Sequence, residues 1–179
     1  EENYTVTGYL KDVRTALDEL LNEITNPRDV LLVGHSLGGN LSIIAASMFP
    51  EVTTVCSLCA PDTLSSLSNQ EWKSSGKKVS YRIIPDNKEE LRTFVLPYSF
   101  VEDAVKYSAM EVASKISAST LFVIALNDES VTPDRTEALV NKVKNSRVIR
   151  LSDMDHHFNR THRDTEVVWE EIKKFLLEN

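Results

Sequence analysis

The stretch that decides the fold reads VLLVGHSLGG and spans residues 30–39. Its first four residues are a continuous apolar run of strand length, which is typical of a strand covered on both faces in a parallel sheet. The glycine-rich turn from Gly34 to Gly39 follows directly, and residues 41–49 have the composition of a buried helix that Pro50 ends. Gly-x-Ser-x-Gly between a strand and a helix is the pattern of a nucleophile elbow, a sharp turn that presents a reactive serine.

Each position of this turn has a physical requirement. We expect Ser36 to have a strained backbone conformation, and we expect Gly34 and Gly38 to lie against neighbouring backbone where a side chain would clash. The serine hydroxyl then stands at the N-terminus of the helix, where the helix dipole and the Leu37 N–H face an oxyanion. His35 is predicted to pack beside the site rather than to act as a base.

Outward from this turn, strand patterns alternate with helical ones. Short apolar runs predict strands, and apolar residues at three- and four-residue steps predict helices. Thr132-Pro133 is a typical helix start, with a threonine N-cap and a proline at the first helical position. This alternation predicts an α/β fold, a mostly parallel sheet with helices on both faces. The other predicted strands are residues 53–59, 78–84, 120–126 and 147–151, and the other predicted helices are residues 10–24, residues 101–115 and a final helix containing residues 167–176.

Composition excludes several classes of function. The 179 residues include 20 Lys and Arg against 27 Asp and Glu, so the net charge is −7. An acidic chain predicts neither nucleic acid nor an anionic membrane as a partner, and no apolar run is long enough to span a bilayer. The first residues are acidic, unlike the basic start of a signal peptide, and two cysteines favour a reducing compartment, so we expect a cytoplasmic protein.

The cysteines and histidines also bear on metal binding. Cys56 and Cys59 form a Cys-x-x-Cys pattern, but two thiols are half of a zinc site, and residues three apart on a strand face opposite sides of a sheet. We therefore expect both to be core residues. His162 is predicted to be solvated at the start of the last helix, so no histidine cluster requires a metal, and no organic cofactor is predicted.

In open α/β sheets, sites lie beyond the carboxyl ends of the strands, so the loops after the predicted strands should contain the partners of Ser36. A nucleophilic serine needs a base, and the base needs an orienting acid. In this kind of site the serine comes first along the chain, the Asp or Glu second and the His third. The sequence fits this order, because Asp128 follows one predicted strand and His156 and His157 follow the next. Residue spacing leaves both histidines open as the base.

Three segments together resemble the α/β-hydrolase superfamily, in particular its small esterase and serine-aminopeptidase-like members, which include cinnamoyl and feruloyl esterases. The segments are the turn at residues 34–39, the loop at residues 127–133 and the loop at residues 155–158. The resemblance runs from the first predicted helix to the last, with a variable middle.

The resemblance implies roles for the loop residues. The acid loop of that superfamily reads roughly Gly-x-x-Asp-x-x-Val-x-Pro, in which Asp128 stands at the acid position and Ala125 replaces the glycine. The histidine loop there reads roughly Gly-Ala-Asp-His-x-Phe, which selects His156 as the base and leaves His157 as the alternative. Some members have their acid after the earlier strand, where Asp62 stands, so Asp62 is the alternative acid.

The implied function is a serine hydrolase that cleaves small-molecule carboxylic esters, or amides and small peptides, through an acyl-enzyme and without a cofactor. The alternatives are acyl transfer to another acceptor and a catalytically silent fold used for binding or structure. Residues 1–62 and 119–179 are the implied core, and residues 63–118 occupy the position of a small cap insertion. An apolar acyl pocket is predicted in that insertion, lined by Trp72, Leu96, Tyr98 and Phe100.

One predicted helix precedes the strand at residues 30–33, whereas the superfamily has further strands there. We therefore expect the N-terminal strands to be absent from this sequence, together with the loop that supplies the second oxyanion donor. The strand at residues 30–33 is then expected to expose an apolar edge. A missing N-terminal segment, or a second copy of the chain in a homo-oligomer, would complete the sheet.

Overall fold

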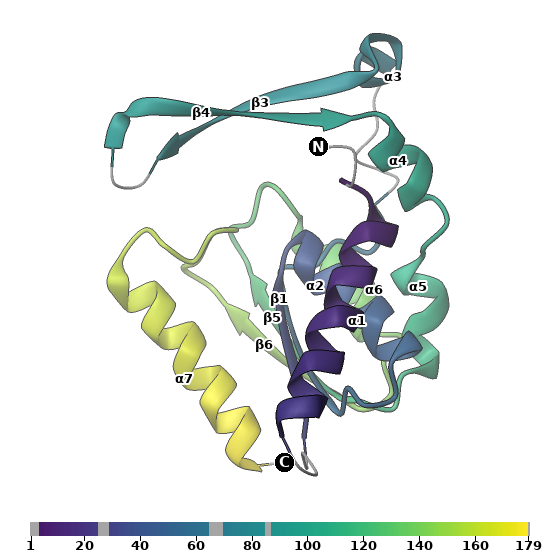
Figure 1. Cartoon of the computed structure of the whole chain (residues 1–179). Coiled ribbons are helices and arrows are strands. Elements are labelled where there is room, and N and C mark those ends of the chain that lie inside the picture. The colour runs from purple at the N-terminus through teal and green to yellow at the C-terminus, as the bar shows by residue number, and fades with distance from the viewer. Residues whose placement is uncertain (1–3, 25–28, 65–69, 85–86, 179) are drawn as a thin grey trace.

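The computed structural model describes residues 4–24, 29–64, 70–84 and 87–178. Its centre is a parallel sheet of four strands in the order β1-β2-β5-β6 (Figure 1). Each of these strands lies within two residues of a predicted one. They are β1 (Leu31–His35), β2 (Thr54–Leu58), β5 (Ser119–Ala125) and β6 (Ser146–Leu151).

Helices cover both faces of this sheet, which confirms the predicted fold class (Figure 1). Successive strand residues face opposite layers, because Phe122 is buried with the helices of one face and Leu121 and Val123 are buried with the helix of the other. On the first face lie α1 (Val6–Glu23), α2 (Leu37–Met48) and α6 (Pro133–Val140), and on the second lies α7 (His162–Glu178).

The two cysteines differ in part from the prediction. Both are buried and free, as expected of core residues. They share one apolar cluster rather than facing opposite sides, because β2 ends at Leu58 and Cys59 follows with a positive φ of 45°. A residue outside the strand no longer obeys the alternation of the pleat, so the turn brings the Cys59 side chain back to the face of Cys56.

The region between β2 and β5 contains a two-stranded hairpin, of which the sequence patterns predict only the first strand. The predicted strand at residues 78–84 is β3 (Lys77–Ile84), and it pairs antiparallel with β4 (Asn87–Pro97). A short helix, α3 (Gln70–Ser75), precedes it. Figure 1 shows the hairpin above the carboxyl ends of the parallel strands, which is the edge where a site is expected.

The predicted single helix at residues 101–115 is wrong. The chain forms α4 (Ser99–Ala104), α5 (Ala109–Val112) and a short 3-10 helix at Ala113–Lys115. The break falls at Ser108, which has an extended conformation and accepts the Glu111 N–H with its hydroxyl. Serine at such a position starts a new helix instead of continuing the old one.

The helices α4 and α5, which lie within the predicted insertion, contribute residues to the main core. Phe100 and Ala109 are buried with residues of α1 and α2. The buried carboxylate of Asp103 accepts hydrogen bonds from the Thr7 N–H at 2.7 Å and the Thr7 hydroxyl at 2.8 Å, which ties α4 to the start of α1. Within the predicted insertion, the hairpin is the part that extends away from the sheet (Figure 1).

The first strand stands at an edge of the sheet. Among the described residues, β1 pairs only with β2, and the Val33 side chain on it is 53% exposed. This agrees with the expected apolar edge. In the described part of the chain, the helices are all too short or too polar to cross a membrane.

Candidate active site

The turn after β1 has the strained geometry that its sequence predicts. Ser36 has φ 56° and ψ −120°, an unusual conformation for a residue with a side chain. Helix α2 begins at the next residue, so Leu37 is its first residue and the Ser36 side chain stands at its N-terminus. The helix dipole and the free N–H groups of the first turn face the space beside the hydroxyl.

The expected reason for glycine, a lack of space for a side chain, does not hold at every glycine of the turn. A Cβ on Gly34 would lie 2.1 Å from the Gly38 carbonyl oxygen, which no side chain tolerates. The prediction for Gly38 is wrong, because a Cβ there would meet nothing within 4 Å. The second crowded position is Gly39, where a Cβ would lie 3.0 Å from both the Ala60 Cβ and the Ser57 Oγ. The close approach therefore falls one residue later than the motif suggests.

Polar side chains of α2 hold the turn against the neighbouring loop. The Asn40 amide donates to the Pro61 carbonyl at 2.7 Å, and the Ser42 hydroxyl donates to the Gly38 carbonyl at 2.8 Å. The Ser36 N–H donates to the Leu58 carbonyl at 2.8 Å. Sequence reasoning missed Asn40 and Ser42; the signal available was a pair of polar residues inside an otherwise apolar helix.

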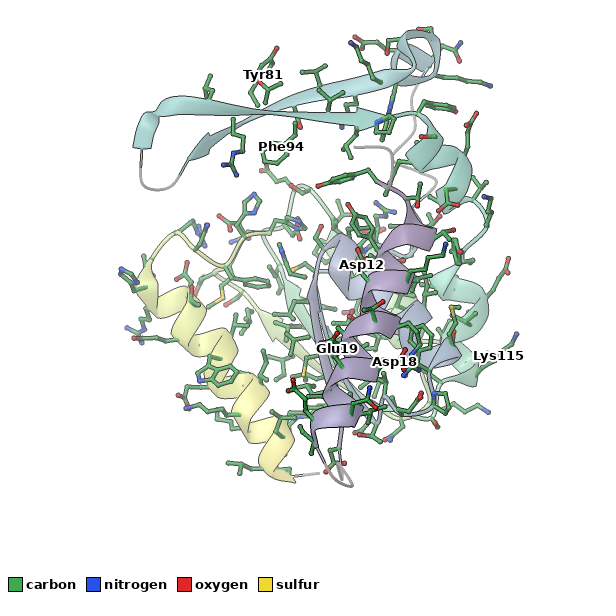
Figure 2. The ribbon with its side chains drawn as sticks, viewed as in Figure 1. Asp12, Asp18, Glu19, Tyr81, Phe94 and Lys115 are labelled. Atoms are coloured by element: carbon green, nitrogen blue, oxygen red, sulfur yellow. The ribbon has the colours of Figure 1, made fainter. Side chains whose placement is uncertain are left out.

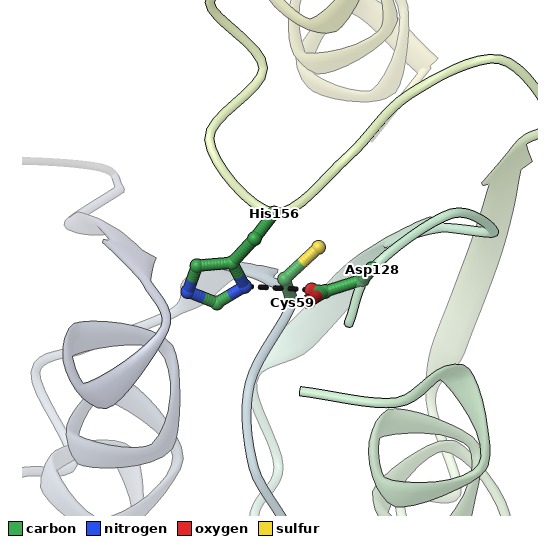
Figure 3. Close-up of side chains that lie close together, drawn as sticks. All are labelled: Cys59, Asp128 and His156. Carbon is green, nitrogen blue, oxygen red and sulfur yellow. Dashed lines mark hydrogen bonds and ion pairs between the residues drawn. The ribbon is translucent and has the colours of Figure 1, made fainter. Parts of the chain in front are cut away.

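The structure brings Ser36, His156 and Asp128 into one hydrogen-bonded chain. His156 Nδ1 lies 2.6 Å from Asp128 Oδ2 (Figure 3). On the other side of the ring, His156 Nε2 lies 3.0 Å from Ser36 Oγ. An ionised carboxylate only accepts, so the imidazole proton sits on Nδ1 and leaves Nε2 to accept from the serine hydroxyl. The three side chains come from the loops after β1, β5 and β6, at the carboxyl edge of the sheet.

The Asp128 carboxylate is buried and fully engaged. Its Oδ1 accepts the Ser130 and Val131 N–H groups at 2.8 Å each, while Oδ2 faces His156. Burial alone would raise the pKa of this carboxyl, but the hydrogen bonds from Val131, His156 and Ser130 outweigh it and lower the pKa. Thr132 stands at the N-cap of α6 as predicted, but its side chain makes no capping hydrogen bond.

His35 contacts the histidine loop rather than the serine. Its Nε2–H donates to the His156 carbonyl at 2.6 Å, which anchors the backbone of that loop. Desolvation lowers the pKa of His35, and the neighbouring His156 and His157 rings act in the same direction, while the bond to the carbonyl opposes them. The ring is therefore a neutral donor under ordinary conditions.

The alternative base and the alternative acid lie apart from this chain of bonds. The His157 side chain is exposed and its ring lies edge-on to that of His156, with centroids 5.2 Å apart. The Asp62 carboxylate pairs with the Arg135 guanidinium at 2.7 Å, and the same guanidinium donates to the Thr63 carbonyl at 2.8 Å. The geometry therefore favours His156 and Asp128 over His157 and Asp62.

Cys59 is a neighbour that sequence reasoning left in the core. It is 1% exposed, and its Sγ, an Asp128 carboxylate oxygen and a His156 ring nitrogen all lie within 4.8 Å of one another (Figure 3). Burial, together with the Asp128 carboxylate, raises the pKa of the thiol to about 12. Among the described non-glycine residues, positive φ occurs at Ser36, Cys59 and Phe158, so backbone strain gathers around this site.

A cavity of about 390 Å³ lies between the hairpin and the body of the molecule, with Leu37 on its wall. Figure 2 shows Phe94 directed from the hairpin toward the body and Tyr81 directed away from it. Of the predicted lining, Tyr98 is absent and lies edge-on to Trp72 instead, at 6.2 Å between ring centroids. The lining consists of Tyr4, Tyr9, Leu37, Trp72, Lys78, Ser80, Thr93, Phe94, Val95, Leu96 and Phe100.

The sheet and the strained serine turn define the class of protein. A parallel sheet flanked by helices, with a serine on a sharp strand-to-helix turn, is the α/β-hydrolase fold. Solved structures support this. The chain is similar to Est1E from Butyrivibrio proteoclasticus (20% identity, TM-score 0.71, covering 99% of this chain and 72% of that one). It is also similar to Paleococcus ferrophilus monoacylglycerol lipase (16% identity, TM-score 0.74, covering 98% of this chain and 76% of that one). A third similar structure is mouse α/β hydrolase domain-containing protein 10 (21% identity, TM-score 0.73, covering 97% of this chain and 70% of that one).

The sequence model of the prolyl oligopeptidase family matches residues 5–179, so the chain belongs to the prolyl oligopeptidase family. A comparison with curated protein sequences gave no significant match. Family and fold together confirm the α/β-hydrolase resemblance and assign the chain to a hydrolase family.

Proposed function

We propose that the protein is a serine hydrolase that cleaves carboxylic esters, with Ser36 as nucleophile, His156 as base and Asp128 as the orienting acid. The observation that carries the proposal is the continuous hydrogen-bonded chain from Ser36 Oγ through the imidazole to the buried carboxylate, at 3.0 and 2.6 Å. Such a chain activates a hydroxyl that is otherwise a weak nucleophile.

The reaction follows from the positions of these groups. Ser36 Oγ attacks the ester carbonyl carbon while His156 Nε2 takes its proton, and Asp128 stabilises the imidazolium that forms. The oxyanion of the tetrahedral intermediate faces the Leu37 N–H and the positive end of α2. The imidazolium then protonates the leaving alkoxide, which leaves an acyl-enzyme on Ser36. Water, deprotonated by His156, attacks the acyl group and releases the acid.

The cavity beside Leu37 supports an apolar acyl group as the substrate class. Its walls are mainly aromatic and aliphatic, and its volume is in the range of small-molecule sites. Est1E, one of the similar structures, has also been solved with ferulic acid bound, at 23% identity to this chain. An ester of a bulky apolar or aromatic acid therefore suits the cavity best.

Peptide-bond hydrolysis is the second candidate, and family membership favours it. The proposed residues serve both reactions, because an amide differs from an ester only in its poorer leaving group. A panel of p-nitrophenyl esters of rising acyl length, set against p-nitroanilides of short peptides, separates the two. Release of p-nitrophenol with long or aromatic acyl groups supports the esterase, and cleavage of the anilides alone would replace it with the peptidase.

A fluorophosphonate probe tests whether Ser36 is a nucleophile at all. We expect the protein to be labelled, Ser36→Ala to lose the label, and Ser47→Ala to keep it, because Ser47 lies on the same helix but donates to the Ile44 carbonyl. No labelling of the folded protein would instead favour a catalytically silent fold. Adding an alcohol acceptor to the ester assay and measuring transesterification against hydrolysis tests acyl transfer.

A further inference from the structure

Three different kinds of metal ligand meet behind the proposed nucleophile. Cys59 follows β2, Asp128 follows β5 and His156 follows β6, so three loops each supply one group. The thiol sulfur, a carboxylate oxygen and an imidazole nitrogen all lie within 4.8 Å of one another (Figure 3). The proposed reaction uses the carboxylate and the imidazole but gives the thiol no role.

We propose that Cys59, Asp128 and His156 form a binding site for a soft divalent cation such as Zn²⁺, and that the bound ion switches the hydrolase off. The binding itself is independent of the reaction, whereas the inhibitory consequence rests on the proposed function. The ion is an inhibitor here and takes no part in catalysis.

The donor set matches the preference of zinc. Zn²⁺ binds thiolate sulfur at about 2.3 Å and imidazole nitrogen or carboxylate oxygen at about 2.0–2.2 Å, usually as a tetrahedron. Two ligands of one such ion are then roughly 3.5 Å apart, so the widest pair has to approach by about 1 Å. His156 Nδ1 and Asp128 Oδ2, which are hydrogen-bonded at 2.6 Å, have to separate by about 1 Å to admit the ion. A rotation of the Cys59 side chain supplies movement of that size, and water completes the coordination.

Charge and access also favour a cation. The Asp128 carboxylate and a Cys59 thiolate together neutralise a divalent ion, so the occupied site has no net charge to bury. A second cavity, of about 380 Å³, has His156 in its wall, and its charged lining residues are Glu129, Asp155 and Arg160. The Arg160 guanidinium pairs with the Asp155 carboxylate at 3.3 Å, so one net negative charge remains among these three residues. Negative charge at the mouth raises the local concentration of cations.

Inhibition follows from the proton positions. On binding, the Cys59 S–H loses its proton to solvent. His156 gives up its Nδ1 proton to solvent and takes one from solvent at Nε2, which frees the Nδ1 lone pair for the ion. The neutral imidazole keeps one proton, which then resides on Nε2. An Nε2–H can donate to Ser36 but cannot accept its proton, so the serine loses its base.

The test measures binding and inhibition separately. In the Ser36→Ala protein, we expect Cd²⁺, a spectroscopic substitute for zinc, to produce ultraviolet cadmium–thiolate absorption at one equivalent per chain, and Zn²⁺ to displace it. Cys59→Ser keeps a hydroxyl at the position and should lower the affinity at least tenfold; Cys59→Ala is the second variant if the first does not fold. The matched control is Cys56→Ser, which removes the other buried thiol of the same cluster and should leave the affinity unchanged.

In the Ser36-containing protein, Zn²⁺ should inhibit ester hydrolysis, EDTA should restore it, and Cys59→Ser should resist inhibition relative to its own metal-free rate. Absence of thiolate absorption, or equal Zn²⁺ affinity in Cys59→Ser and the parent, would overturn the site. Binding through Cys59 that leaves a measured esterase rate unchanged would overturn the switch. Binding through Cys59 in a protein without hydrolase activity would support the site and overturn the proposed function instead.

Discussion

The crowding at Gly34 makes Gly34→Ala a direct test of the turn geometry. The added Cβ would lie 2.1 Å from the Gly38 oxygen, 2.3 Å from the Gly38 carbonyl carbon and 2.5 Å from Ser42 Oγ. Two of these neighbours are backbone atoms, so β1 and the first turn of α2 must move apart by roughly 1 Å. Overpacking of this kind costs about 3 kcal/mol when backbone rather than a side chain has to yield. For a domain of this size, that lowers the melting temperature by about 6–12 °C.

The two other glycines of the turn provide matched controls. A Cβ on Gly39 would meet the Ala60 and Ser57 side chains at 3.0 Å, so Gly39→Ala should cost about 1–2 kcal/mol. Gly38 lies in the first turn of α2 with open space around it, so Gly38→Ala should be neutral or should stabilise by up to about 1 kcal/mol.

Urea denaturation of the three variants, followed by circular dichroism, measures these free energies of unfolding. The expected order of stability is Gly38→Ala, then Gly39→Ala, then Gly34→Ala. A Gly34→Ala protein within 1 kcal/mol of the parent, or a Gly38→Ala protein that is the least stable of the three, would refute the close approach of β1 and α2.

Further predictions concern the charged groups. Asp128→Asn should lower kcat for ester hydrolysis about 10⁴-fold with little change in KM, because the imidazole loses its orienting acceptor. Steady-state kinetics measures both constants. A loss of kcat under tenfold would contradict the assignment of Asp128 as the acid. The lowered pKa of Asp128 stabilises the fold above the pKa of the unfolded carboxyl, about 3.9, and this contribution disappears as pH falls through the native pKa. Urea titrations between pH 5 and pH 2 should therefore show a flatter pH dependence in Asp128→Asn. The lowered pKa of His35 means that acidification below about pH 6.5, its unfolded value, should destabilise the protein, and His35→Gln should remove that loss between pH 8 and pH 5. Asp103→Ala leaves the Thr7 N–H without its acceptor and should cost about 2–3 kcal/mol in denaturant melts, against less than about 0.5 kcal/mol for Glu102→Ala on the exposed side of α4.

The elements that could be predicted from the sequence are those with strong local signals. The run at residues 30–33 and the turn that follows predict β1, the elbow and α2, because strand length, glycine spacing and apolar composition all act within about ten residues. Predicted strands at residues 53–59, 120–126 and 147–151 agree with β2, β5 and β6 for the same reason.

The errors arise at a local cap that the pattern did not reveal and where long-range packing overrides the local pattern. The helix expected at residues 101–115 is divided because Ser108 caps a new helix. In addition, the Asp103 carboxylate accepts a hydrogen bond from the Thr7 N–H, 96 positions earlier in the chain. Strand β4 begins with a mainly polar stretch and has a continuous apolar run only at residues 94–96, and its pairing with β3 positions it. The crowding of Gly39 rather than Gly38 depends on Ala60 and Ser57, which belong to a different segment.

For the candidate site, the sequence indicates the residue types and their order along the chain, but it does not indicate which side chains are in contact. A serine on a glycine turn, an aspartate after one strand and a histidine pair after the next predict which residue types should meet. Tertiary structure decided that the His156 ring rather than that of His157 faces Ser36, that Asp62 pairs with Arg135, and that the Cys59 thiol lies beside Asp128. Local sequence encodes backbone conformation, whereas the meeting of side chains from three separate loops depends on how the whole sheet and its covering helices pack.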